Sequence, residues 1–531
     1  MNYLWRCLVP LVFLLATSYL KVCMGSLSVE EPAAGGVSKY IHEMHDGDIY
    51  GYLVNGEWRK SESGNTLKIL TPYDESQCFE IQACTPAEID AAFEAARAAQ
   101  AKWAQTPLHA KAALLKRAGA FLRENKGVIA DALVKEVAKG RRAAVAEVVR
   151  SAELLEYTAE EAVRVMGEGR LLLPDSFPGH ERDKLCLAQR VPLGVVLCMP
   201  PFNYPVNLCC SKVGPALMAG NAIVVKTPTQ GAVSCLYVGA ALEAAGLPPG
   251  VANFVTGRGS EIGDHLVTHP LADCLSFTGG STGLAASRKA GMVPLQMELG
   301  GKDCAIVCSD ADLDMAADHI VKGAFSYSGQ RCTAVKLLIV QNQIADELLE
   351  RVLARARALS VGHPEDNTDV TAVISRASAD FIQGLYEDAR KKGAKQLMEW
   401  RREGNLIWPM ILDQVTTEMD VHYTEPFGPL LPVVRVSSIE EAIEKANGSP
   451  MGLQGSVFTR DINKALMIAD KLATGTVQVN GAPARGPDHF PFQGFKDSGL
   501  GTQGVRHSLL SMTKVKSVVI NLPGPTYSSG V

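Results

Sequence analysis

The chain is predicted to fold as an α/β protein built on parallel sheets, and two observations lead to this prediction. Short apolar runs, of the kind that form strands buried on both faces, alternate with helix-like segments from residue 191 onward. Each run is followed by a turn that contains glycine or proline, as expected where a strand passes into a helix. The predicted strands are residues 195–199, 222–225, 252–255, 274–277, 304–307, 337–340 and 431–434.

The residues before this region predict short strands and then long helices. An Asn-Gly turn signal at Asn55 and Gly56 lies between apolar residues, which indicates a hairpin within residues 52–58. The tetrapeptide that begins at Thr85 matches a helix start, because it has a capping hydroxyl, then proline, then glutamate three residues after the cap. Apolar residues at helical spacing predict further helices over residues 112–122, 129–134 and 145–157.

Two glycine-rich segments compete as phosphate-binding turns. Residues 257–263 resemble the dinucleotide-binding GxGxxG pattern but are one residue out of register, so they are predicted to form a structural turn from strand to helix. Residues 277–281 follow a predicted strand, open a helix and offer free backbone amides, which favours them as the pyrophosphate site. Near the end of the chain, residues 515–522 form a solitary apolar strand. We expect it to pair with a strand edge elsewhere, including one on a partner subunit.

The composition excludes several classes of protein. The 531 residues are 47% hydrophobic and 21% charged, which supplies enough apolar material for more than one large core. A net charge of −5, without a stripe of lysine and arginine, excludes a nucleic-acid-binding protein. The 13 cysteines show no regular framework, which favours a reducing compartment over a secreted disulfide scaffold, and the 11 dispersed histidines predict no metal site.

The first 44 residues are predicted to be an N-terminal extension, and its role is open. Residues 8–20 form an apolar run after Arg6 that is too short to span a bilayer comfortably but suits the core of a signal peptide. The alternatives are a misassigned start, with Met24 as the true first residue, and a short membrane anchor. We expect a cytoplasmic protein, with a targeted or membrane-associated form as the alternative.

Four short motifs follow one another in a fixed order, and a fifth comes later. The motifs are residues 201–205 (PFNYP), 277–279 (FTG), 297–301 (MELGG), 329–332 (GQRC) and 425–429 (EPFGP). In this order and spacing they resemble the aldehyde dehydrogenase superfamily, over about residues 45–525. The resemblance implies an aldehyde dehydrogenase-like fold with a Rossmann-type cofactor domain, an α/β catalytic domain and a small β oligomerisation element.

The same resemblance predicts the domain boundaries. Residues 45–297 would bind the cofactor, interrupted near residues 167–187 by an oligomerisation hairpin. Residues 298–500 would form the catalytic domain, and residues 501–531 would hold the C-terminal oligomerisation strand. A homotetramer is implied by the resemblance alone.

Three residues of these motifs suit the oxidation of an aldehyde. Cys332 is the predicted nucleophile, because addition of a thiolate makes the carbonyl carbon tetrahedral before hydride transfer, and the neighbouring Arg331 is expected to lower the thiol pKa. Asn203 is the predicted donor to the oxyanion, together with the backbone N–H of Cys332. Glu298 looks like the family's general base for thioester hydrolysis, and semi-burial is expected to raise its pKa. The alternatives are a turn-shaping asparagine and a glutamate in a buried ion pair.

Lys226 and Thr229 follow a predicted strand where the superfamily binds the adenosine ribose. NAD-preferring relatives often have a glutamate at the position of Thr229. A carboxylate would repel a 2′-phosphate whereas a lysine with a hydroxyl would bind it, so we predict NADP as the cofactor. Thr227 stands where plant members of this superfamily have proline, and this departure bears on the predicted preference for NADP. The other residues that the resemblance assigns to the cofactor are Asp264, Gly279, Gly280, Ser281 and Glu425.

Arginines near the motifs indicate an anionic aldehyde, because a guanidinium group suits phosphate or carboxylate. Residues 326–336 and 483–497 are most similar to the plant and algal non-phosphorylating glyceraldehyde-3-phosphate dehydrogenases, a branch of the superfamily. The resemblance implies oxidation of D-glyceraldehyde 3-phosphate to 3-phosphoglycerate, a reaction of glycolytic intermediates, with NADP and water and without inorganic phosphate. The residues predicted to bind the substrate are Arg150, Asn203, Tyr204, Arg331, Cys332, Thr333 and Arg485.

Other functions are compatible with the same residues. A semialdehyde dehydrogenase would recognise a carboxylate with these arginines and is the main alternative. A CoA-acylating enzyme is disfavoured because Glu298 supplies a hydrolytic base, and the phosphorylating glyceraldehyde-phosphate enzyme has a different fold and a Cys motif not found here. A silent scaffold of this fold is disfavoured because Asn203, Glu298 and Cys332 occur together.

Overall fold

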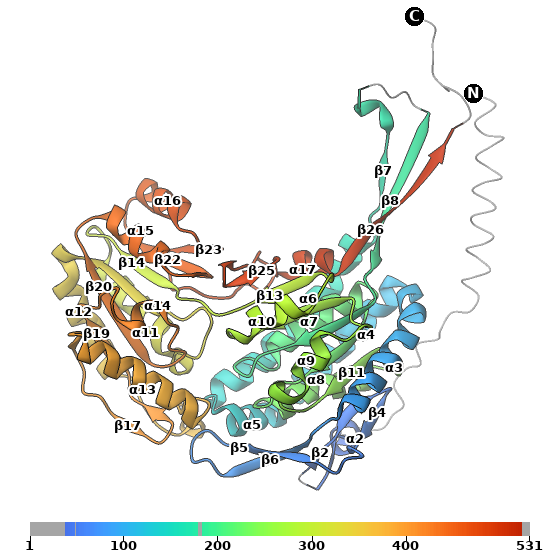
Figure 1. The fold of residues 1–531 in the computed structure, drawn as a ribbon, viewed down its shortest axis with the longest axis horizontal. Coiled ribbons are helices and arrows are strands. Elements are labelled where there is room, and N and C mark those ends of the chain that lie inside the picture. The colour runs from blue at the N-terminus through green and yellow to red at the C-terminus, as the bar shows by residue number, and fades with distance from the viewer. Residues whose placement is uncertain (1–37, 48, 179–182, 523–531) are drawn as a thin grey trace, which may run out of the picture.

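Two α/β lobes lie side by side, and a β arm projects from one of them (Figure 1). The structure is a computed structural model that describes residues 38–47, 49–178 and 183–522. Within these residues, no helix is long and apolar enough to cross a membrane. The apolar segment at residues 8–20 lies outside the described residues. The predicted α/β class is confirmed.

In the described part of the chain, the larger lobe is built on an eight-stranded sheet. Its strands, in spatial order, are β25 (Gly499–Leu500), β13 (Leu295–Glu298), β12 (Cys274–Thr278), β9 (Val195–Met199), β10 (Ala222–Lys226), β11 (Ala252–Val255), β3 (Tyr52–Val54) and β4 (Glu57–Arg59). The five strands from β13 to β11 are parallel, and the edge strands join antiparallel. The chain runs from β9 outward to β11 and then returns to the other side of β9 with β12. Ligands of such sheets bind beyond the carboxyl ends of the strands at this reversal of order.

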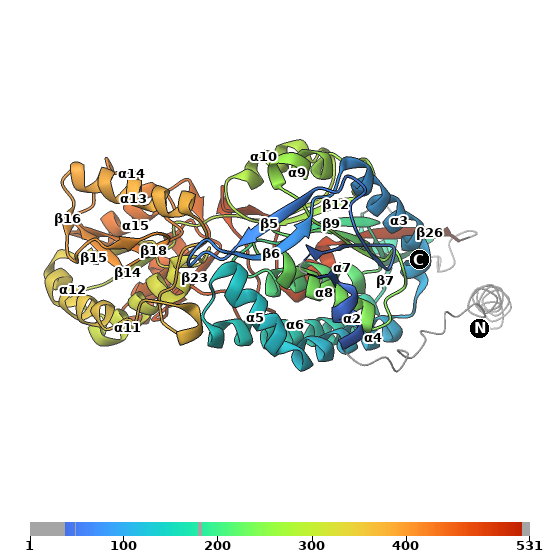
Figure 2. The same cartoon turned by 90° about the horizontal axis from the view of Figure 1, so that it is seen from below.

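Helices cover both faces of this sheet (Figure 2). Successive strand residues point to opposite faces, so Val195 and Leu197 of β9 pack with one helix layer while Val196 and Cys198 pack with the other. Both sets are apolar, which is why the strand appears in the sequence as a continuous apolar run. The first layer contains α3 (Pro86–Gln105), α9 (Gly259–Val267) and α10 (Thr282–Lys289); the second contains α4 (Leu108–Glu124), α5 (Lys126–Val137), α6 (Arg141–Met166), α7 (Asn207–Met218), α8 (Ala232–Ala244) and α17 (Val505–Ser511).

The smaller lobe repeats this design on a seven-stranded sheet, counted over the described residues. Its strands, in spatial order, are β16 (Lys395–Gln396), β19 (Met410–Asp413), β20 (Leu430–Val436), β15 (Leu337–Gln341), β14 (Cys304–Val307), β22 (Gln454–Phe458) and β23 (Thr476–Val479). All except β16 are parallel. One face carries α11 (Leu313–Phe325) and α12 (Asn342–Arg357), and the other carries α13 (Arg376–Lys391), α14 (Asp420–Tyr423), α15 (Ile439–Asn447) and α16 (Ile462–Lys471).

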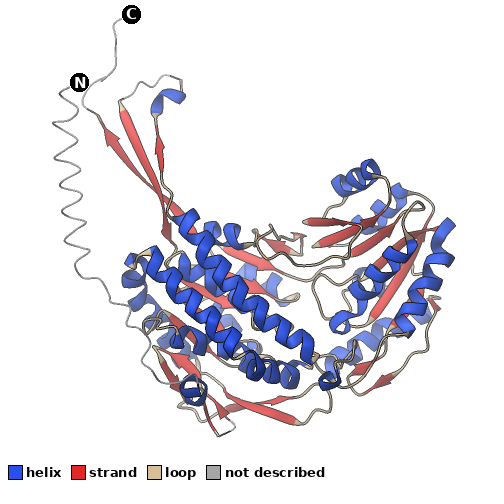
Figure 3. Ribbon diagram, turned by 180° about the vertical axis from the view of Figure 1, so that it is seen from behind, coloured by secondary structure: helices blue, strands red, loops and turns tan. Residues whose placement is uncertain are grey.

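The arm is a three-stranded antiparallel sheet that stands clear of both lobes (Figure 3). It consists of β7 (Arg170–Leu172), β8 (Lys184–Pro192) and β26 (Thr513–Asn521). β26 pairs with β8 along its whole length, from Thr513 opposite Pro192 to Asn521 opposite Lys184. The predicted late strand therefore pairs with a strand of its own chain. Its apolar side chains remain exposed, among them Val515, Val518 and Val519.

A small sheet lies beside the larger lobe and completes the N-terminal region. Its strands are β1 (His45–Asp46), β2 (Ile49–Tyr50), β6 (Gln77–Gln82) and β5 (Thr66–Leu70), preceded by α2 (Ser38–Glu43). Two short ribbons lie elsewhere, β17 (Arg402–Glu403) with β18 (Leu406–Ile407) and β21 (Met451–Gly452) with β24 (Phe495–Lys496).

Most predicted elements are confirmed, including the seven strands, the hairpin and the helix start. Asn55 and Gly56 have the positive φ angles, 56° and 75°, of the predicted hairpin turn. Thr85 and Glu88 form the predicted capping box. The segment from Gly257 is a strand-to-helix turn, as predicted, since it connects β11 to α9. One strand pairing was not predicted. β25 pairs with β13, so the chain has returned to the larger lobe by Gly499.

Candidate functional site

A cavity of about 490 Å³ lies between the two lobes, at the carboxyl ends of β9 and β12. The larger lobe contributes the residues that follow β9, β12 and β13, and the smaller lobe contributes the segment that contains Cys332 and the loops around Glu425 and Met451. The cavity therefore occupies the reversal of strand order, where a ligand is expected. Residues predicted from the sequence that line it are Asn203, Gly279, Gly280, Ser281, Cys332 and Glu425.

A tight turn positions the segment that carries Cys332. Tyr327, Ser328 and Gly329 have φ angles of 51°, 56° and 71°, an unusual run of left-handed backbone for two residues that are not glycine. At Gly329 a Cβ atom would lie 2.4 Å from the carbonyl oxygen of Gly428, so a larger residue cannot fit without displacing that loop. The turn therefore holds Cys332 against the wall of the cavity.

The Cys332 thiol lies in a buried and mixed electrostatic environment. Its Sγ donates a hydrogen bond to Glu298 Oε1 at 3.4 Å. Burial raises the pKa of Cys332 well above its ordinary value, and Glu298 raises it further, against the opposing effect of Lys336. The expectation that Arg331 lowers this pKa is wrong, because the Arg331 guanidinium is turned toward α11 and donates to the Gly323 carbonyl at 2.6 Å.

Glu298, the last residue of β13, joins the thiol to two cations. One carboxylate oxygen accepts from Cys332, and the other contacts Arg485 Nη1 and accepts from Thr278 Oγ1 at 3.3 Å. Burial by itself raises the pKa of Glu298, but Arg485 and Lys212 together outweigh it, so the pKa is lowered. The predicted upward shift is therefore wrong in this state of the protein, and the alternative of a buried ion pair describes the geometry.

Lys212 is a functional residue that the sequence interpretation missed. It lies on α7, is fully buried, and donates to Thr278 Oγ1 at 2.6 Å. Burial lowers the pKa of Lys212 to about 8. Thr278 in turn contacts Glu298, so Lys212 orients the carboxylate through the threonine hydroxyl. The available signal was a lone lysine within an otherwise apolar helix, since a buried lysine needs a partner.

Asn203 lies next to the segment of Cys332 on the wall of the cavity. Its side chain is 3% exposed, and its Nδ2 donates to the Gln330 carbonyl at 2.9 Å. The Asn203 carbonyl accepts a hydrogen bond of 2.6 Å from Lys139, which is itself ion-paired with Glu147. Lys139 therefore fixes the backbone of Asn203, while the Gln330 carbonyl fixes its side-chain amide beside the segment of the nucleophile.

The predicted substrate arginines lie in different surroundings. Arg485 is buried against Glu298, and its Nη2 donates to Gln503 Oε1 at 2.7 Å. Arg150 forms two hydrogen bonds with Asp488, at 2.6 and 2.8 Å, and a third with the Arg485 carbonyl. The structure therefore brings Arg150 and Arg485 together, whereas Arg331 points into α11.

Two other predicted substrate residues surround the same segment. The Tyr204 ring lies 3.7 Å from Lys139 Nζ and edge-on to Tyr327. Thr333, next to Cys332, is buried. Both therefore support the shape of the nucleophile's segment, and neither lines the 490 Å³ cavity.

The predicted cofactor residues form two groups along the cleft. Gly279, Gly280 and Ser281 lie on the cavity wall where β12 passes into α10. The Gly279 amide donates to the Glu298 carbonyl at 3.1 Å, so it is the amides of Gly280 and Ser281 that face a diphosphate. Glu425 lies opposite, with Oε1 at 2.9 Å from Lys336 Nζ and accepting from the Gly301 amide at 3.3 Å. A Cβ atom at Gly300 would lie 2.2 Å from Glu425 Oε2, so glycine is required for this approach.

The second group lies at the far end, beyond β10 and β11. Lys226 ends β10 and is buried, which lowers its pKa to about 8. Thr229 Oγ1 donates to the Gly257 carbonyl at 3.2 Å. Asp264, on α9, is largely exposed and paired with Lys289 Nζ at 2.6 Å. Polar groups on both sides of an elongated cleft, with a glycine-lined diphosphate turn between them, fit a dinucleotide such as NADP.

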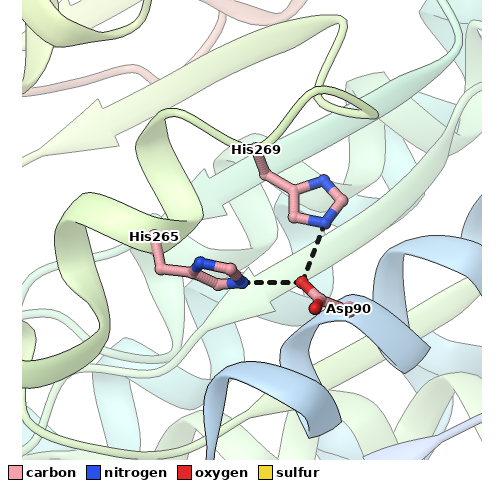
Figure 4. Close-up of side chains that lie close together, drawn as sticks. All are labelled: Asp90, His265 and His269. Atoms are coloured by element: carbon pink, nitrogen blue, oxygen red, sulfur yellow. Dashed lines mark hydrogen bonds and ion pairs between the residues drawn. The ribbon is translucent and has the colours of Figure 1, made fainter.

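Asp90, His265 and His269 converge away from this cleft, a cluster that the sequence interpretation missed although the two histidines are four residues apart (Figure 4). Asp90 Oδ1 lies 2.6 Å from His265 Nε2 and 3.2 Å from His269 Nε2. His269 Nδ1 accepts the Leu271 N–H at 3.1 Å, which leaves the ring proton on Nε2 facing Asp90. A metal-ligating histidine instead donates from its other nitrogen. Asp90 therefore connects α3 to α9 through its hydrogen bond with His265, and it lies at ion-pair distance from His269, which follows α9.

Comparison with known proteins gives consistent results. A family model described as the aldehyde dehydrogenase family matches residues 58–518. An NADP-dependent glyceraldehyde-3-phosphate dehydrogenase of Arabidopsis thaliana is 57% identical over 488 residues, which cover 92% of this chain and 98% of that protein. The enzyme of the same name from Streptococcus equinus is 47% identical and covers 89% and 99% of the two chains.

The solved structures agree with the sequence relatives. The NADP-dependent glyceraldehyde-3-phosphate dehydrogenase from Bacillus halodurans, complexed with NADP, superposes with a TM-score of 0.88 at 47% identity, covering 89% of this chain and 99% of that chain. A glyceraldehyde-3-phosphate dehydrogenase from Methanocaldococcus jannaschii, also complexed with NADP, gives a TM-score of 0.81 at 32% identity, covering 86% and 99%.

Proposed function

The chain belongs to the aldehyde dehydrogenase family, and from this premise we propose that it oxidises glyceraldehyde 3-phosphate to 3-phosphoglycerate with NADP and water. Relatives that carry the name NADP-dependent glyceraldehyde-3-phosphate dehydrogenase cover nearly the whole described chain. The observation that carries the proposal is the contact of Cys332 with Glu298, and of Glu298 with Arg485, beside one cavity. A nucleophile, a base and an anion-binding group then lie within one hydrogen-bonded chain.

The first step is addition of the Cys332 sulfur to the aldehyde carbon. The raised thiol pKa means that the thiol needs a base, and Glu298 Oε1 already accepts the hydrogen bond from Sγ. Glu298 therefore takes the thiol proton as the carbon–sulfur bond forms. The side-chain amide of Asn203 is the proposed donor to the oxyanion. Lys139 holds the residue in place through a hydrogen bond to its main-chain carbonyl.

The second step is hydrolysis of the thioester that remains after oxidation. Bound NADP would supply the hydride acceptor, held at Gly279–Ser281 on one side and near Glu425 on the other. Glu298 first releases the thiol proton to solvent and then takes a proton from the attacking water, for which its carboxylate must be loosely held. As the new carbon–oxygen bond forms, the carbon–sulfur bond breaks and Cys332 leaves as the thiolate. No inorganic phosphate or CoA takes part in this sequence.

Arg485 connects the substrate to the base. In this structure its guanidinium compensates the charge of Glu298. A substrate phosphate bound by Arg485 and Arg150 adds two negative charges beside Glu298, which weakens the pairing and raises the pKa of the carboxyl. Binding of a phosphorylated aldehyde would thereby restore the basicity that hydrolysis requires.

The decisive assay measures NADPH formation from glyceraldehyde 3-phosphate without inorganic phosphate and without CoA. We expect one NADPH for each 3-phosphoglycerate formed. Turnover of succinic semialdehyde with no turnover of glyceraldehyde 3-phosphate would overturn the substrate assignment in favour of a semialdehyde dehydrogenase. A folded, reduced sample that oxidises neither aldehyde would indicate a silent scaffold.

We also propose a cytoplasmic homotetramer joined through the arm. The arm exposes large apolar side chains, including Leu171, Leu172, Phe177 and Leu187. Exposure of so much apolar surface to water is unfavourable, which supports a partner subunit that covers it. All eleven cysteines in the described residues are free thiols, as expected in a reducing compartment. Sedimentation of the purified chain tests the assembly, and a monomer at micromolar concentration would contradict it.

A further inference from the structure

A buried lysine lies beside the segment of the nucleophile and outside the steps of the proposed reaction. Lys336 directly precedes β15 and is 2% exposed. Its backbone N–H donates to the Asp303 carbonyl at 2.9 Å, and the next residue, Leu337, pairs with Cys304 of β14. The main chain at Lys336 is therefore fixed by the sheet of the smaller lobe.

The ammonium group of Lys336 contacts two groups of the site. Its Nζ donates to the main-chain carbonyl of Cys332 and lies 2.9 Å from Glu425 Oε1. Both partners line the 490 Å³ cavity. A Cβ atom at Gly301 would lie 2.9 Å from the same Cys332 carbonyl oxygen, so the main chain of the glycine motif packs closely against it. The carbonyl is thus held between a cation and this motif, which fixes the backbone from which the sulfur projects.

Lys336 also shapes the electrostatic environment of the thiol. Burial and Glu298 raise the pKa of Cys332. Lys336 is the leading group that lowers this pKa, ahead of Arg485, whereas Asp303 raises it. Arg485 is in close contact with Glu298, so the opposite effects of these two residues on the thiol largely cancel. A thiolate in a buried site needs a compensating cation, and Lys336 has the charge and the position to supply it.

The sequence pointed to a different cation for this purpose. Arg331 adjoins Cys332 but is turned toward α11, where it donates to the Gly323 carbonyl. Lys336 lies four residues further along the chain, and its side chain returns to the Cys332 carbonyl.

We propose that Lys336 is the positioning residue of the nucleophile, because its ammonium group holds the Cys332 carbonyl and compensates the charge of the thiolate. This inference rests on the proposed role of Cys332 and adds the cation that this role needs. When Glu298 takes the thiol proton, the negative charge moves from the carboxylate to the sulfur. Lys336 then stabilises the sulfur until the carbon–sulfur bond forms.

The test measures the rate at which iodoacetamide alkylates Cys332 from pH 6 to pH 10, with the full chain and with neither cofactor nor aldehyde present. Mass spectrometry of the peptide that contains Cys332 separates this thiol from the other cysteines. We expect Lys336→Met to shift the pH profile upward by about one unit, which slows alkylation at pH 7 by about tenfold. Lys336→Arg retains the charge and should lie between the wild type and Lys336→Met.

Two further variants separate the charge of Lys336 from a general disturbance of the site. Lys302→Met is the matched control, because Lys302 is likewise buried in this region but donates to the Thr424 carbonyl, at 2.9 Å. It should leave the profile in place. Glu425→Gln removes the carboxylate that pairs with Lys336, so the profile should stay in place or shift to lower pH, opposite to Lys336→Met.

Three outcomes would overturn the inference. They are an unmoved profile in Lys336→Met, an equal upward shift in Lys302→Met, and an upward shift in Glu425→Gln as large as that in Lys336→Met. The thermal midpoint of each variant is measured alongside, and Lys336→Arg and Glu425→Gln still test the charge if the methionine variant unfolds. If the variants behave as expected but the wild type does not oxidise glyceraldehyde 3-phosphate, the proposed reaction is refuted and the role of Lys336 stands.

Discussion

The charged side chains at the two ends of the cleft differ in how deeply they are buried. At the catalytic end the charges are buried and compensated within the protein, as in the pairs Glu298–Arg485 and Lys336–Glu425. At the far end the Arg258 guanidinium is exposed, and no carboxylate within the described residues comes closer to it than Glu261, at 3.7 Å. The charges are thus paired at both ends, but the pairs are largely buried at the catalytic end and exposed to solvent at the far end, where they are Arg258–Glu261, Lys289–Asp264 and Arg376–Glu75.

This difference has energetic consequences. Removing one partner of a buried pair leaves the other charge without compensation in a medium of low dielectric constant, so both activity and stability should suffer. Removing an exposed cation changes a screened interaction, so binding should change while stability does not. Variants at the two ends should therefore separate into these two classes.

The largest effect is expected for Cys332→Ser. Without the thiol, aldehyde oxidation should fall by more than about 10⁴-fold, since no other group can form the covalent adduct. The variant should bind NADPH as the wild type does, measured by fluorescence. Substantial turnover in this variant would show that Cys332 is not the nucleophile.

Glu298→Gln tests the base within the buried pair. Steady-state turnover should fall by about 10²–10⁴-fold, the range of a general base, and the thioester should accumulate. Mass spectrometry of the intact chain after substrate addition would detect the adduct on Cys332. The thermal midpoint should also fall, because Arg485 loses its closest carboxylate and keeps only the more distant Asp488, at 3.7 Å. If Glu298→Gln hydrolyses the thioester as fast as the wild type and no adduct accumulates, another residue is the base.

Arg485→Gln separates substrate binding from control of the base. We expect a higher KM for glyceraldehyde 3-phosphate and an acid limb of the thioester hydrolysis rate shifted to higher pH, because Arg485 then no longer helps Lys212 to offset the effect of burial on the pKa of Glu298. Arg150→Gln is the matched control, which should raise KM without moving the limb. An unmoved limb in Arg485→Gln would contradict the coupling.

The same pair makes a stability prediction with a definite sign. Because the folded pKa of Glu298 lies below its ordinary value of 4.5, the pairing stabilises the fold above that pH and loses this effect as the pH falls through the folded pKa. The difference in thermal midpoint between the wild type and Arg485→Gln should therefore shrink in acid. A difference that stays constant as the pH falls from 7 to the onset of acid unfolding would contradict this.

The smallest effect is expected from pH at the cofactor end. Because the pKa of Lys226 is about 8, deprotonation above that pH should weaken NADPH binding, by at most about tenfold per pH unit. Titrations from pH 7 to pH 9.5 at constant ionic strength would reveal the dependence, and a flat profile would exclude a role for the Lys226 charge.

Much of the fold could be predicted because its signals are local. The runs that form β9 and β11 gave the observed bounds, since a strand buried on both faces is apolar throughout. The register of β26 against β8 could not be obtained in this way, because it depends on contacts between segments more than 300 residues apart.

The residues of the site could be predicted from the sequence, but the directions of their pKa shifts could not. The motifs pointed to Asn203, Glu298 and Cys332, which the structure brings to one place. The pKa shifts of Glu298 and Cys332 were expected with the wrong sign, because they are set by Arg485, Lys212 and burial rather than by sequence neighbours. Adjacent residues on a turn point in different directions, which is why Arg331 faces α11 and not the thiol.

The pairing of β25 with β13 and of β26 with β8 has a consequence for biosynthesis. The ribosome makes β13 and β8 long before their partners, and β8 precedes β26 by more than 300 residues. A nascent chain must therefore keep these strand edges unpaired until the partner strands have been made. A chain truncated before Thr513 would keep the cavity residues and still expose the unpaired edge of β8, which favours aggregation.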